Sequence, residues 1–95
     1  MHHVYILYSQ SLNKYYTGET SNLETRLIHH NTGFYKNAFT VITDDWILFC
    51  KIDCEDIFQA RKIEKHIKLM KSNMYILNLK KYPEIKEKLL IRYRK

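Results

Sequence analysis

The stretch VYILYSQSLNKYYTG, residues 4–18, decides the fold that the sequence predicts. Residues 4–8 and 14–18 are rich in aliphatic and aromatic side chains, a composition typical of β-strands. The segment between them, residues 9–13, is polar and of the kind that forms turns. The chain is therefore expected to begin with a β-hairpin.

The register of this hairpin determines which side chains meet across the strands. If the turn is centred between Gln10 and Ser11, Tyr5 lies directly opposite Tyr16 and the two phenols face one another. Strand tyrosines are usually packing residues, so the pair gains meaning only from other polar groups nearby.

A helix and a strand are expected next. Residues 21–24 (SNLE) match a capping box and Gly33 supplies a stop, which predicts a helix over residues 22–32. Residues 37–45 are expected to form a loop. The nearly continuous apolar run WILFCKI, residues 46–52, predicts a buried central strand.

The rest of the chain is predicted to be helical, with a long helix over residues 57–71, a shorter one over 74–80 and a basic one over 84–93 that Pro83 opens. The fold class is α/β: a single-domain sandwich in the order β-β-α-β-α-α. Its small, mostly antiparallel, three-stranded sheet is flanked by helices.

Charge favours a polyanionic partner. Sixteen Lys and Arg against ten Asp and Glu give a formal charge of +6, which attracts nucleic acid, although many basic proteins bind nothing. Cys50 and Cys54 form neither a disulfide framework nor a zinc motif, so a reducing, cytoplasmic location is expected. The sequence shows no signal-peptide pattern and no apolar stretch long enough for a membrane span.

Two helices carry polar residues on faces expected to point inward. In the first, Arg26 and His30 share a face with Leu23 and Leu27. An inward-facing arginine needs an anionic partner, unless it reaches the rim of the core.

In the long helix, Glu64 lies at the edge of an apolar stripe. A carboxylate there is costly unless it binds a cation or pairs with Arg26 or a lysine, and both readings stay open. The stripe consists of Ile57, Ala60, Ile63, Ile67 and Met70.

The order and spacing of these residues resemble the GIY-YIG nuclease superfamily over residues 4–72, and most closely its small stand-alone bacterial members. Each short motif is a weak signal, whereas the ordered set is specific. The matching motifs are His3-Val4-Tyr5, Tyr16-Thr17-Gly18, Asn22-Leu23, Arg26-Leu27, His30-Asn31, Gln59-Ala60 and Glu64-Lys65-His66-Ile67-Lys68.

The resemblance implies hydrolysis of phosphodiesters with one divalent cation, Mg²⁺ or Mn²⁺. It makes Glu64 the metal ligand and gives Arg26 the task of stabilising charge on the phosphate. Tyr5 and Tyr16 line the attack site, one of them orienting or deprotonating the water. His30 contacts the phosphate or helps to move a proton.

The sequence departs from the superfamily pattern at three positions. His3 stands in place of the expected Gly and Thr17 in place of the usual Ile, which concerns strand packing. Glu19 stands where repair-nuclease relatives carry a Lys, so Lys14 or Lys36 has to tune the tyrosine. Contacts with nucleic acid are expected from Lys14, Asn31, Lys36 and Lys68.

The resulting hypothesis is an endonuclease that cuts DNA in repair or recombination, with residues 1–80 as the nuclease-like domain and 81–95 as a basic C-terminal helix or tail. DNA is the expected partner, without a membrane or a small-molecule cofactor. One alternative is a non-catalytic nucleic-acid-binding module with the same fold. Another is an interaction protein whose tail, residues 80–95, docks a partner. The DNA structure cut and the oligomeric state stay open.

Overall fold

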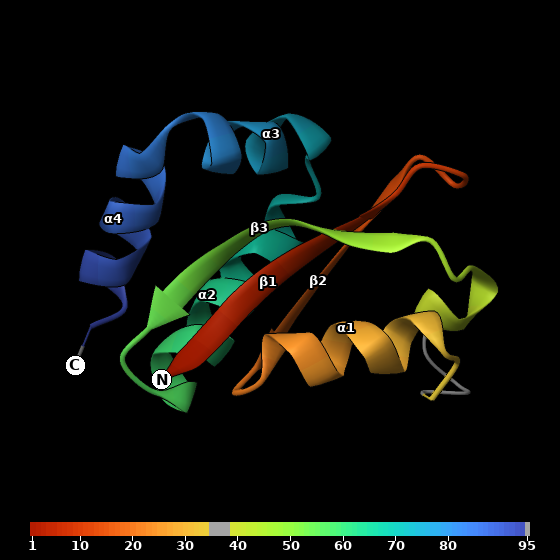
Figure 1. Cartoon of the computed structure of the whole chain (residues 1–95). Coiled ribbons are helices and arrows are strands. Elements are labelled where there is room, and N and C mark those ends of the chain that lie inside the picture. Colours follow the sequence, from red (N-terminus) through yellow and green to blue (C-terminus); the bar gives the residue numbers. More distant parts are fainter. Residues whose placement is uncertain (35–38, 95) are drawn as a thin grey trace.

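The computed structural model describes residues 1–34 and 39–94, which form an α/β sandwich (Figure 1). Three helices follow the last strand, where the three helical segments over residues 57–71, 74–80 and 84–93 were predicted. The elements are β1 (His2–Ser9), β2 (Lys14–Thr20), α1 (Leu23–Asn31), the 3₁₀ helix η1 (Phe39–Ile42), β3 (Trp46–Cys54), α2 (Ile57–Met70), α3 (Asn73–Lys81) and α4 (Pro83–Arg92).

The sheet is antiparallel with the strand order β2-β1-β3, which confirms the small three-stranded sheet. The prediction that the third strand is central was wrong, because β1 takes that place and residues 4–7 are buried on both of its faces. β3 lies at an edge, and its Ile47 and Leu48 are exposed. An apolar run alone therefore did not distinguish a central strand from an edge strand.

Alternate side chains of β1 enter two separate cores. Val4 and Ile6 pack into the larger core, which α2, α3 and α4 also line. Tyr5 and Leu7 enter the smaller core with Trp46, and α1 covers that side. In Figure 1, α2 runs behind the sheet and α1 lies along its other side. None of the described helices is long and apolar enough to cross a membrane.

The predicted register of the hairpin was wrong. Tyr5 is paired with Gly18, and Tyr16 is paired with Leu7. The turn therefore occupies residues 10–13, one residue later than expected. Tyr5 and Tyr16 are diagonal neighbours, with ring centroids 6.4 Å apart.

One local and one long-range feature place the turn. Asn13 adopts a left-handed conformation with φ of 51°, which asparagine tolerates better than most residues. The Asp45 carboxylate accepts hydrogen bonds from the Ser9 hydroxyl (2.6 Å) and the Ser11 amide (2.9 Å). This contact spans more than thirty residues and fixes the hairpin from outside.

The N-cap of α1 is Asn22, whose Oδ1 accepts from the Thr25 amide at 3.1 Å. The predicted capping box, which begins at Ser21, therefore placed the N-cap one residue too early. Asp56 caps α2 in the same way, and the helix ends at Lys71 with a left-handed φ of 48°. Met70, in the last turn, is exposed rather than part of the buried stripe.

The expected loop over residues 37–45 is only partly described. Residues 37 and 38 lie outside the described residues, and Phe39–Ile42 form η1.

Candidate active site

The predicted site begins with a buried chain of polar side chains. A hydrogen bond of 3.0 Å joins Tyr5 Oη and His30 Nε2, and another of 2.6 Å joins His30 Nδ1 and Thr40 Oγ1. Tyr5 is 1% exposed and His30 is 2% exposed. Both ring nitrogens of His30 are thus used inside the protein, and the imidazole holds the Tyr5 phenol in place.

His30 is neutral near neutral pH. Burial, together with the nearby charges of Arg26 and His29, lowers its pKa from 6.5 to about 4. The low pKa and the burial argue against direct contact between an imidazolium and a phosphate, one of the two roles expected for His30.

We predict that His30 makes the protein less stable as pH falls. Its pKa is lower in the folded state than in the unfolded state, so between about 6.5 and 4 only the unfolded chain gains the proton. Stability should fall by about 3 kcal/mol over this range, at 1.36 kcal/mol per pKa unit. The free energy of unfolding, measured with denaturant at several pH values, should change less with pH in His30→Gln than in the unmodified protein. The other histidines are common to both proteins, so the difference reports on His30. Equal slopes would mean that His30 titrates normally.

Tyr16 is the more accessible of the two tyrosines. It is half-buried, and its ring centroid lies 5.1 Å from that of His30. Lys68 Nζ lies 5.9 Å from the Tyr16 ring centroid. Tyr16 is thus the tyrosine placed to meet a ligand beside a positive charge.

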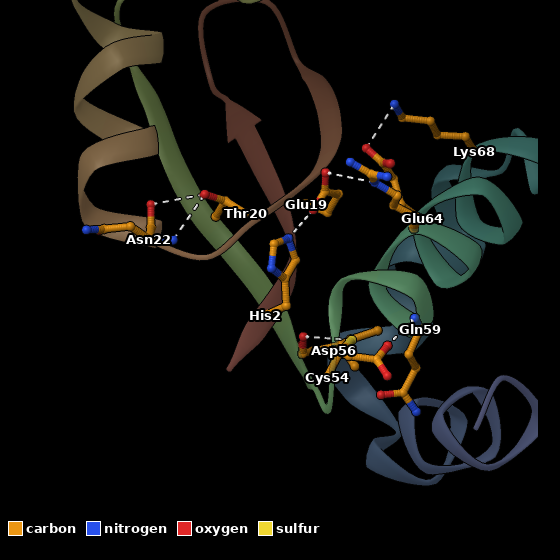
Figure 2. Close-up of polar contacts among 11 residues, drawn as sticks. His2, Glu19, Thr20, Asn22, Cys54, Asp56, Gln59, Glu64 and Lys68 are labelled. Carbon is orange, nitrogen blue, oxygen red and sulfur yellow. Dashed lines mark hydrogen bonds and ion pairs between the residues drawn. The ribbon is translucent and has the colours of Figure 1, made fainter. Parts of the chain in front are cut away.

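Glu64 reaches the same place from α2. Its half-buried carboxylate forms an ion pair of 3.2 Å with Lys68, one turn later on the helix. Figure 2 shows the two side chains together on α2. One of the two interpretations of Glu64, an ion pair with a lysine, is therefore observed. Because Lys68 is exposed, its ammonium can move away and leave the carboxylate open to a cation.

Arg26 completes the set from α1. The inward face predicted for this helix is confirmed: Leu23, Arg26 and Leu27 are half-buried and His30 is buried, whereas Ile28 is exposed. The influence of Arg26 on the pKa of His30 places its charge near that ring.

Glu19, which stands where relatives carry a Lys, has basic side chains as neighbours. Glu19 is hydrogen-bonded to His2 (Figure 2). Its Oε1 also lies 3.8 Å from Arg61 Nε. Of the two lysines expected to compensate, Lys14 lies exposed at the start of β2, and Lys36 is outside the described residues. The cation over the Tyr16 ring is Lys68, which sequence reasoning assigned only to nucleic-acid binding.

Asn31 serves the fold. Its side-chain amide donates to the Trp46 carbonyl (2.9 Å) and its Oδ1 accepts from the Trp46 amide (2.8 Å). These two bonds tie the end of α1 to the start of β3. They argue against the phosphate contact expected of Asn31.

The donor set suits a hard divalent cation. The described residues contain no cluster of three or more His, Cys, Asp or Glu side chains, so a metal cage of protein ligands is absent from that part. Mg²⁺ needs no such cage, because it binds through one or two carboxylates and completes its shell with water and substrate phosphate oxygens. A single half-buried carboxylate at Glu64 fits this pattern.

Gly18 leaves room for Tyr5. A Cβ atom at position 18 would overlap the Tyr5 hydroxyl and Cζ, with Cε1 only 3.0 Å away. Because Tyr5 is buried, its ring cannot swing into solvent. This is the reason for the Tyr-x-Gly spacing of the second motif in this chain.

We therefore predict that Gly18→Ala destabilises the protein by about 1–3 kcal/mol, the usual range for overpacking a core. It should also reduce activity by displacing Tyr5 from His30. The matched control is Gly33→Ala, at φ of 72°, where a Cβ would meet only Val41 among the described residues; it should cost backbone strain and spare activity. Denaturant unfolding and an activity assay check both variants, and a stable, fully active Gly18→Ala would contradict the packing argument.

The family comparison is consistent with this geometry. The family model described as the GIY-YIG catalytic domain matches residues 1–78. The chain belongs to the GIY-YIG family. The match contains all the candidate catalytic residues, which come from β1, β2, α1 and α2, and it ends within α3. No curated protein and no solved structure matches the chain. The chain thus belongs to a nuclease-type, endonuclease family, and α4 lies outside the matched region.

Proposed function

We propose that this GIY-YIG protein is a metal-dependent endonuclease that hydrolyses phosphodiester bonds in DNA and acts in repair or recombination. One observation carries the proposal: an unbroken series of contacts runs from His30 through Tyr5 and Tyr16 to Lys68 and Glu64. These residues come from separate parts of the sequence, and packing alone does not require such a series.

In this proposal Tyr16 orients the attacking water and accepts its proton. Only a phenolate can accept this proton, and Lys68 is the cation that lies beside the Tyr16 ring. Tyr5 and His30 do not meet the substrate in this proposal, because both are buried and hydrogen-bonded to each other. They support Tyr16 from inside the protein. This assigns the base step to one of the two tyrosines.

Arg26 and Glu64 act on the phosphate from opposite sides of the sheet edge. The Arg26 guanidinium binds the phosphate oxygens and stabilises the negative charge that builds up as the bond breaks. Glu64 would hold the divalent cation, Mg²⁺ or Mn²⁺, once its ion pair with Lys68 opens. When bound, the cation supplies Lewis-acid stabilisation of the same charge.

The partner follows from charge. A formal charge of +6 favours contacts with phosphates irrespective of base sequence, so affinity for DNA should fall steeply as salt increases. Cys50 and Cys54 are buried free thiols, which fits the proposed cytoplasmic location.

The proposal is tested by incubating the protein with end-labelled DNAs of different structure: linear duplex, single strand, flap and four-way junction. Each is tested with Mg²⁺, with Mn²⁺ and with EDTA. Metal-dependent cutting of at least one substrate is expected. DNA binding without cutting under any of these conditions would overturn the proposal in favour of a non-catalytic binding module.

A further inference from the structure

A groove lies between α2 and the end of α4, away from the candidate active site. It has a volume of about 430 Å³. Its charged lining comes from Lys62, Lys65 and Arg92, and its apolar lining from Leu69, Met70 and Tyr93.

The groove lies on a different flank of α2 from the metal ligand. An α-helix turns by about 100° per residue, so residues 64 and 68 share one flank and residues 62 and 69 share another. Arg92 and Tyr93 lie beyond residue 78, where the match to the catalytic domain ends. The groove is therefore built partly from an element added to that domain.

The charges of the groove are available to a ligand. Among the described residues, Lys62, Lys65 and Arg92 form no ion pair, and the groove lining includes no Asp or Glu. Three uncompensated cations around one concave surface favour an anionic partner.

The apolar part narrows the choice of anion. Leu69 is 67% exposed and Met70 is 46% exposed. Beside them, the Tyr93 hydroxyl is hydrogen-bonded to His66 Nδ1 at 2.9 Å, and the Arg92 guanidinium lies 5.4 Å from the Tyr93 ring centroid. Proteins that bind single-stranded nucleic acid combine a cationic groove, which holds the phosphates, with apolar and aromatic side chains, on which the unpaired bases stack. An acidic peptide would use the cations and leave the apolar surface uncovered.

We propose that the groove between α2 and α4 binds a single-stranded extension of the DNA substrate. The strand passes over α2, a distance of about 10–12 Å across one helix, and its phosphates bind Lys62, Lys65 and Arg92. Its bases pack on Leu69, Met70 and the Tyr93–Arg92 pair. The identity of the strand as part of a DNA substrate rests on the proposed function, whereas the binding does not.

The methionines offer a local readout of binding. The three methionines of the chain are Met1 at the N-terminus, Met70 in this groove and Met74 in a separate pocket beside Phe49. NMR of protein labelled at the methionine methyl carbons, with oligothymidylate and EDTA, should show the Met70 signal shifting on titration. The Met1 and Met74 signals should stay in place.

Charge removal provides the matched comparison. The triple variant K62A/K65A/R92A should lower affinity for oligothymidylate at least tenfold at moderate salt. The control K80A/K81A/K88A removes the same net charge elsewhere on α3 and α4 and should lower it far less. Thermal melting of both variants establishes that they are folded.

Three results would overturn the proposal. One is a Met70 signal that does not move with oligothymidylate. Another is an equal loss of affinity in the two triple variants, which would mean diffuse attraction over the whole surface. The last is a Met70 shift that is as large with oligoglutamate as with oligothymidylate, which would make the groove a site for acidic peptides. Since EDTA prevents cutting throughout, a protein that never cuts DNA can still show the Met70 shift, and the two proposals fail separately.

Discussion

Glu64→Gln is expected to abolish DNA cleavage and leave the protein folded. The carboxylate is the single protein ligand proposed for the divalent cation, and an uncharged amide of the same shape binds Mg²⁺ or Mn²⁺ poorly. Cutting should fall to the level seen in EDTA. Binding of DNA in EDTA should be unchanged or slightly tighter, because a negative charge is removed near the phosphate.

The structure explains why stability should survive this change. Glu64 is half-buried, and its ion pair is with the exposed Lys68. Exposed helix pairs at this spacing contribute only about 0.3–0.5 kcal/mol. Thermal melting should therefore shift little. The matched control is Glu87→Gln on the exposed face of α4, which should cut like the unmodified protein. Metal-dependent cutting by Glu64→Gln would remove Glu64 from the metal site.

Arg26→Ala is expected to bind DNA nearly as well as the unmodified protein and to cut it about 10²–10³-fold more slowly. The guanidinium acts on charge that develops in the transition state, and losing one such donor typically costs this much. Single-turnover rates and equilibrium binding, measured on the same DNA, separate the two effects. Arg26→Lys should recover only part of the rate, because an ammonium lacks the two-pronged geometry.

If the role of Arg26 is only structural, a different result is expected. If Arg26 only holds α1 in place, Arg26→Ala should lose circular dichroism signal, with activity falling in proportion. An independent readout is the pKa of His30, which the Arg26 charge helps to lower from its ordinary value. In a folded Arg26→Ala, NMR titration should show this pKa rising from about 4 towards 6.5. The control Arg94→Ala, which removes an exposed arginine elsewhere, should leave both rate and pKa unchanged.

The helices were predictable because local signals define them. Asp56 before Ile57 and Pro83 at the start of α4 act within a few residues of the ends that they set. The inward face of α1 followed from helical spacing, which is also local. The same periodicity placed Glu64 at the edge of the buried stripe, where the structure finds it half-buried.

The sheet was less predictable because its geometry depends on distant contacts. The Asp45 carboxylate helps to fix the hairpin turn from a loop far along the chain, so the sequence of the hairpin alone gave the wrong register. Likewise, β3 reads as a central strand, yet its place at the edge is set by which strands pair with β1.

Within the candidate site, the ordered motifs predicted which residues take part, and the structure shows how the surroundings of these residues differ. Nothing local shows that Tyr5 is buried while Tyr16 is partly open, or that Lys68 reaches over Tyr16 from another element. Asn31 stood next to His30 in the motif, and only the structure shows that it binds the Trp46 backbone.

The central claim is that the site around Tyr16 and Glu64 cuts DNA with a divalent cation. The most direct measurement is a single-turnover time course on the four end-labelled DNAs, with purified protein in Mn²⁺, in EDTA, and in EDTA followed by excess Mn²⁺. Glu64→Gln, purified in parallel, controls for a contaminating nuclease. The account predicts cutting in Mn²⁺, none in EDTA, recovery on adding Mn²⁺, and none with Glu64→Gln. Cutting that persists in EDTA, or that Glu64→Gln retains, would contradict it.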